Sequence, residues 1–170
     1  MKRLWLLVLV AVAAAAGWWW RESLFPGELT RVRRSLEVLA TEVSFTSKEG
    51  GIATGRRVSS LVDHFTPEAV IEVEILGAGT FHLNGRGEIQ QAMWGARRAA
   101  SSLQVRFFDI LVDLASDGQT ASAHLTATAD AKGNRRNQEG FEAMEFRFQL
   151  RRLDGAWKVQ QVATVQTLKQ

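Results

Sequence analysis

Apolar residues in the first half of the chain recur three and four positions apart, the period of an amphipathic helix. One such stripe covers residues 29–43, and a polar, glycine-bearing passage at residues 47–55 follows it. A second stripe ends at Phe65, because the backbone before the proline of the Thr66–Pro67 pair disfavours a helix. A third stripe covers residues 89–100. The pattern therefore predicts three helices.

After the proline the apolar period changes to two. Ile71, Val73 and Ile75 alternate with two glutamates, which predicts a half-buried strand. Glycines then turn the chain into a short strand at residues 80–83. Longer strands are predicted at residues 103–114, 120–131, 141–153 and 156–167. This order of elements predicts an α+β domain in which a curved antiparallel sheet wraps around about three helices.

The amino-terminal region differs from the rest of the chain. Lys2 and Arg3 precede seventeen uncharged residues, Leu4 to Trp20. At about 1.5 Å per residue this stretch is roughly 25 Å long, near the lower limit for a membrane-spanning helix. It ends in three tryptophans, which are typical of the membrane–water interface. We interpret residues 1–20 as a membrane anchor that contacts lipid through residues 4–20.

Two alternatives to the anchor remain open. Ala14 and Ala16 precede Gly17 in the spacing of a signal-peptide cleavage site, so the segment is alternatively a removed signal. The other alternative is a buried helix of the domain. With an anchor, the two basic residues at the start favour a cytoplasmic amino terminus and an extracytoplasmic domain; with a cleaved signal the domain is secreted or periplasmic. Residues 21–27 then form a linker, and residues 28–170 form the domain.

The composition of the chain excludes several kinds of functional site. With 170 residues, 46% hydrophobic and 23% charged, the chain has the size of one globular domain. It contains no cysteine, which excludes thiolate catalysis and sulfur-ligated zinc. His64, His82 and His124 lack metal-ligand spacing, so we expect no metal or other cofactor. A net charge of only +3 gives no indication of nucleic-acid binding.

Four local sequences, in their order along the chain, resemble a known superfamily. They are FTPEAVIEVEI at residues 65–75, NGRGEIQQAM at 84–93, SDGQTASAHLTA at 116–127 and RLDGAWKVQQV at 152–162. Residues 28–168 resemble the nuclear transport factor 2-like, or SnoaL-like, superfamily. The resemblance implies a cone whose concave side encloses an apolar pocket. Its members include isomerases, dehydratases, epoxide hydrolases and non-catalytic binding modules, so the resemblance alone does not give the activity.

The alternation of apolar and polar residues along the strands predicts which side chains face this hollow, and Phe81 and Trp94 are expected at its rim. They either fill it as a core or line a pocket for an apolar ligand. The predicted pocket residues are Ile71, Val73, Phe81, Trp94, Phe108, Met144, Phe146, Phe148 and Trp157.

Candidate catalytic groups are few. The resemblance implies acidic and tyrosine side chains in isomerase-like members, but this chain has no tyrosine and its Glu72 and Glu74 are expected to face outward. Asp109 and Asp113 lie roughly 13 Å apart on a strand, too far for a carboxylate pair that hydrolyses a glycosidic bond. His64, at the end of the second helix, is the one candidate base, with a capping or surface histidine as the alternative.

The outer sheet face is a candidate interaction surface. Phe107 and Leu111 are expected there beside His124 and Thr126, which suggests a homodimer or a protein partner. The resulting hypothesis is a membrane-tethered, non-catalytic module that binds an apolar small molecule or a protein. The alternatives are a SnoaL-like isomerase, dehydratase or hydrolase acting on an apolar substrate, and an assembly component of an envelope complex.

Overall fold

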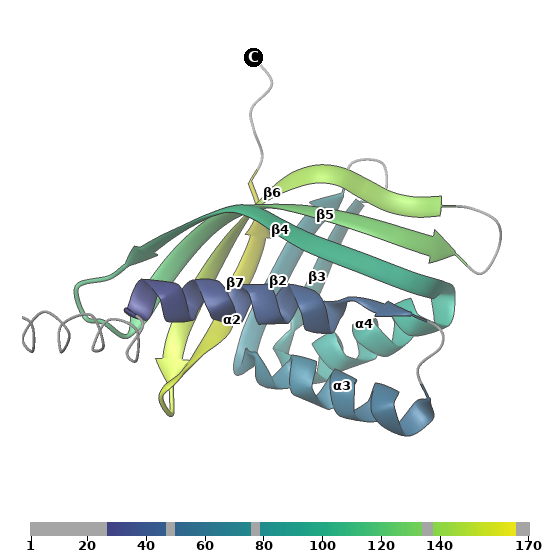
Figure 1. The fold of residues 1–170 in the computed structure, drawn as a ribbon, viewed down its shortest axis with the longest axis horizontal. Coiled ribbons are helices and arrows are strands. Elements are labelled where there is room, and N and C mark those ends of the chain that lie inside the picture. The colour runs from purple at the N-terminus through teal and green to yellow at the C-terminus, as the bar shows by residue number, and fades with distance from the viewer. Residues whose placement is uncertain (1–26, 47–49, 76–78, 134–137, 166–170) are drawn as a thin grey trace, which may run out of the picture.

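The computed structural model describes residues 27–46, 50–75, 79–133 and 138–165. Three helices pack against one curved sheet of seven strands, and α2 crosses the sheet with α3 and α4 beside it (Figure 1). The helices are α2 (Glu28–Val43), α3 (Gly51–Asp63) and α4 (Gly85–Ala99). The strands are β1 (Phe45–Thr46), β2 (Phe65–Ile75), β3 (Gly79–Asn84), β4 (Ala100–Leu114), β5 (Thr120–Gly133), β6 (Gln138–Leu153) and β7 (Ala156–Thr164).

The sheet has the strand order β1-β4-β5-β6-β7-β2-β3. Neighbouring strands are antiparallel except β2 and β7, which run parallel. The predicted α+β class, with a curved sheet around three helices, is confirmed. The sheet is mixed rather than wholly antiparallel, because the last strand, β7, lies beside β2 and runs in the same direction.

Helix α2 buries the predicted apolar stripe. Val32 and Leu36 are fully buried and Leu39 is 2% exposed. Leu29, in the first turn of the helix, is half exposed instead. These side chains belong to one core with the inner face of β5, where every second residue from Ala121 to Ala129 is buried, and β4 is the strand that α2 contacts most.

The predicted limits of the second helix are wrong at both ends. Helix α3 already begins at Gly51, inside the passage expected to be irregular, and Phe65 belongs to β2. Pro67 lies in that strand, where pairing with β7 is interrupted between Phe65 and Val70. A proline is tolerated there because the missing N–H removes no bond from a regular ladder.

A β-bulge in β4 overturns one predicted strand face. Asp109 has φ +50°, and pairing with β5 skips from Phe108 to Leu111. The extra residue reverses the alternation, so that side chains before and after it change faces. Phe107 therefore packs inward on Phe148, with ring centroids 5.7 Å apart, while Phe108 is 45% exposed on the outer face. The predictions that Phe108 lines the hollow and that Phe107 lies outside are both wrong.

The predicted anchor, residues 4–20, and most of the predicted linker lie outside the described residues. Among the helices of the described ranges, none is long and apolar enough to span a membrane.

Candidate functional site

Part of the predicted pocket set fills the hollow. Phe146, Phe148 and Trp157 are each 4–6% exposed and belong to one continuous core with Leu36 of α2. The fully buried Ala123 pairs with Phe148 on the neighbouring strand. These aromatic side chains, the small alanines of β5 and the apolar stripe of α2 are therefore buried together in one core.

The remaining residues of that set form what we call the apolar rim: Ile71, Val73, Phe81, Trp94 and Met144. Phe81 is 49% exposed, and the other four are partly buried against the core. Phe81 pairs with Val73 across β2 and β3, so both side chains lie on the concave face. The concave face is thus filled beneath α2 and remains partly exposed to solvent along the rim.

Among the described residues, none with a titratable side chain is fully buried. Thr66 is the only buried polar side chain among the described residues. Glu72 and Glu74 are exposed, as predicted. Arg97 stacks over Phe45 at 4.6 Å from the ring centroid, but a guanidinium is a permanent cation and does not act as a base. Within the described ranges, no group of three or more His, Asp or Glu side chains is arranged so that it could hold a metal ion.

A carboxylate and an imidazole do meet outside the core. His64, the C-cap residue directly after α3, places Nε2 3.2 Å from Oε2 of Glu42 in the last turn of α2. Both side chains are about one-fifth exposed. The contact has the distance of an ion pair without hydrogen-bond geometry, whereas Ser60 Oγ donates a hydrogen bond of 2.8 Å to Glu42 Oε1.

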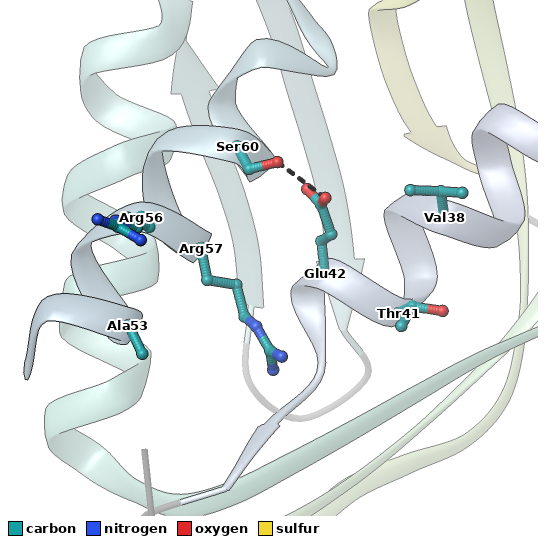
Figure 2. Close-up of a pocket in the computed structure, with 7 residues that line it drawn as sticks. All are labelled: Val38, Thr41, Glu42, Ala53, Arg56, Arg57 and Ser60. Atoms are coloured by element: carbon teal, nitrogen blue, oxygen red, sulfur yellow. Dashed lines mark hydrogen bonds between the residues drawn. The ribbon is translucent and has the colours of Figure 1, made fainter. Parts of the chain in front are cut away.

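This pair lies beside a groove between α2 and α3 (Figure 2), which we call the α2–α3 groove. The groove has a volume of about 630 Å³. Arg57 extends into the space between the two helices, while Ser60 and Glu42 point toward one another. The lining residues are Val38, Thr41, Glu42, Ala53, Arg56, Arg57 and Ser60.

The arrangement has the components of general acid–base chemistry. A carboxylate oxygen of Glu42 lies 3.2 Å from Nε2 of His64, so a carboxylate and an imidazole are close enough to act on the same proton. Ser60 donates to Glu42 and not to His64, so these residues do not form a nucleophilic triad. His64 was found from the sequence as a candidate base. Glu42 was missed, because it lies off the apolar stripe of its helix, and the sequence pattern indicates no partner for it.

The sequence model of the SnoaL-like domain matches residues 49–163. The chain belongs to this family. No curated protein sequence matches the chain.

Solved structures similar to this SnoaL-like domain share its fold at low sequence identity. A predicted scytalone dehydratase from Novosphingobium aromaticivorans is 15% identical, with a TM-score of 0.63 over 82% of this chain and 85% of the other. An NTF2-like protein with a cystatin-like fold from the same organism is 16% identical, with a TM-score of 0.58 over 84% and 86%. A hexachlorocyclohexane dehydrochlorinase is 12% identical, with a TM-score of 0.59 over 82% and 88%.

Proposed function

We propose that this SnoaL-like domain binds an apolar small molecule at the apolar rim and carries out no chemistry there. The observation that supports this is the half exposure of Phe81, which pairs with the partly buried Val73 at the edge of the core. A ligand that covers about 200 Å² of such surface gains about 5 kcal/mol before the cost of association, by the usual value per unit of apolar area.

Methionine methyl NMR provides a direct test. The chain has three methionines, of which Met93 is buried in α4 and Met144 belongs to the rim. Naphthalene, added to the full chain in phosphatidylcholine nanodiscs, is expected to shift the Met144 methyl signal in a saturable manner. The aromatic ring of the ligand changes the local magnetic field of a methyl group that it touches.

Matched variants locate the effect. Val73→Arg places a charge in the rim and is expected to abolish the shift of Met144. Leu111→Arg places the same charge on the outer sheet face, where Leu111 is 67% exposed, and is expected to leave the shift unchanged. A Met144 signal that naphthalene never moves, or that moves equally in both variants, would contradict binding at the rim.

The predicted anchor completes the proposal. We propose that residues 4–20 hold the domain at a membrane with the domain on the extracytoplasmic side, since three tryptophans end an uncharged stretch that follows two basic residues. Sequencing of the mature amino terminus tests this. A chain that retains its first residues and stays in the membrane fraction after alkaline extraction supports the anchor, whereas a mature start at Gly17 excludes it.

Catalysis at the Glu42–His64 pair is the second candidate function. The 3.2 Å contact favours it, and two structural neighbours bear the names of lyase enzymes. Scytalone and hexachlorocyclohexane, the compounds in those names, are suitable probes. Turnover of either compound that His64→Asn abolishes would replace the binding function with catalysis; no turnover is expected under the non-catalytic proposal.

We also propose self-association through the outer sheet face, with a changed set of residues. Phe108 takes the place of Phe107 there, beside Leu111, His124 and Thr126. Two large apolar side chains, 45% and 67% exposed, favour contact with a second copy. Sedimentation of the full chain in detergent is expected to show a dimer that Leu111→Arg dissociates. A monomer at high concentration would rule it out.

A further inference from the structure

We infer that the α2–α3 groove is a second ligand site, separate from the apolar rim, that binds a small monocarboxylate with a short apolar tail. Its volume of about 630 Å³ lies within the range of small-molecule sites. It combines cationic, hydroxyl and apolar side chains from two helices, in contrast to the uniformly apolar rim.

The charge of the groove selects an anion. The negative charge of Glu42 already has partners within the chain, since Ser60 bonds to Oε1 and His64 faces Oε2. Arg56 and Arg57 outnumber this one carboxylate, so the lining carries a formal charge of +1. Arg57 makes a further contact of its own in the chain, but a guanidinium carries five N–H donors and can serve more than one acceptor. The planar pair of donors on an arginine matches the two oxygens of a carboxylate.

Two features restrict the ligand further. Val38 is 39% exposed and Ala53 is also exposed, so the groove offers apolar surface to a short hydrocarbon tail. Glu42 lies in the same groove and repels a second negative charge. A phosphate monoester, which carries a charge of about −1.5 to −2 at neutral pH, is thus less suitable than a carboxylate with a single charge.

Histidine NMR tests the site, with hexanoate as the probe. The chain has three histidines, and only His64 lies beside the groove; His82 is on β3 and His124 on β5. Hexanoate, titrated into the full chain in nanodiscs at constant pH and ionic strength, is expected to shift the imidazole signals of His64 saturably. The signals of His82 and His124 serve as internal controls and are expected to stay in place.

The charge requirement has its own controls. Hexanol has the same tail without the carboxylate and is expected to bind at least tenfold more weakly. Replacing both Arg56 and Arg57 with Gln is expected to weaken hexanoate binding at least tenfold, while Arg106→Gln, an exposed position on β4, leaves it unchanged. Equal shifts of all three histidines, or equal binding of hexanol, would overturn the inference even if the double variant failed to fold.

The proposals for the groove and for the rim can be contradicted independently of each other. Hexanoate bound in the groove is expected to leave the Met144 methyl signal unmoved, and naphthalene at the rim is expected to leave His64 unmoved. If hexanoate shifted Met144 instead of His64, the groove site would be wrong and binding at the rim would stand.

Discussion

The two flanks of helix α2 face regions of opposite character. One flank places Leu36, with no exposed surface, in a core that holds no buried carboxylate or imidazole among the described residues. The other places Val38 and Glu42 in a groove with two arginines and, beside it, a histidine. In this SnoaL-like domain the sheet therefore supplies apolar surface, and the helix pair supplies titratable groups. The two ligand sites proposed above differ in this same respect.

The largest expected effect is the difference in unfolding free energy lost when a side chain is shortened on each flank of α2. Leu36→Ala leaves a cavity in a fully packed region, so the free energy of unfolding is expected to fall by about 3 kcal/mol. Val38→Ala, two residues away in the groove, is expected to lower it by less than about 1 kcal/mol. Urea denaturation followed by circular dichroism measures both values. Similar losses in the two variants would mean that the groove flank is packed as tightly as the core.

The adjacent phenylalanines of β4 allow the contribution to stability of the inner sheet face to be compared with that of the outer face. Phe107→Ala removes a ring that packs on Phe148 and is expected to cost about 3 kcal/mol of unfolding free energy. Phe108→Ala removes a ring that is 45% exposed and is expected to cost about 1 kcal/mol or less. The same urea titrations measure the difference. A larger loss at Phe108 would place the bulge elsewhere in the strand.

The hydrophobic period predicted the parts of the fold in which buried residues recur at a constant spacing. The stripe of α2 and the alternating alanines of β5 are examples, because burial there repeats with the period of the element. The bulge was missed because one residue in left-handed backbone reverses the alternation, and an aspartate is among the few non-glycine residues that tolerate this conformation. Nothing in the hydrophobic pattern marks Asp109 as that residue.

The contacts of the candidate site were less predictable than the fold. Glu42 and His64 are 22 positions apart in the sequence, and only the packing of α3 against α2 brings them together. Arg33 of α2 similarly donates a hydrogen bond of 3.0 Å to the carbonyl of Ile110, next to the bulge. Such contacts depend on the orientation of two elements, which no local pattern contains.

A smaller effect is expected for the interaction energy between Glu42 and His64, the pair beside the groove. Glu42→Gln and His64→Asn, made singly and together, form a double-mutant cycle in the free energy of unfolding. The coupling energy is expected to reach at most about 1 kcal/mol, because both side chains are partly solvated. Glu37→Gln, at an exposed position of the same helix, is the control and is expected to show no coupling to His64. A coupling well above this value would indicate a more strongly desolvated pair, and zero coupling would mean that the contact does not persist in solution.

The smallest expected effect lies at the turn between β4 and β5, whose residues do not line the α2–α3 groove. Asp117 Oδ1 accepts backbone hydrogen bonds from Gln119 at 2.8 Å and Thr120 at 3.0 Å, and these bonds lower the pKa of Asp117 below its ordinary value of 3.8. Because the folded pKa is the lower one, the charged carboxylate stabilises the fold fully above about pH 4 and loses this contribution as the pH falls through the folded pKa. In urea titrations from pH 6 to pH 2, Asp117→Asn is therefore expected to be slightly less stable than the parent chain at pH 6, with the difference shrinking at the acid end. A difference that grew toward low pH would reverse the sign of the shift and contradict these turn contacts.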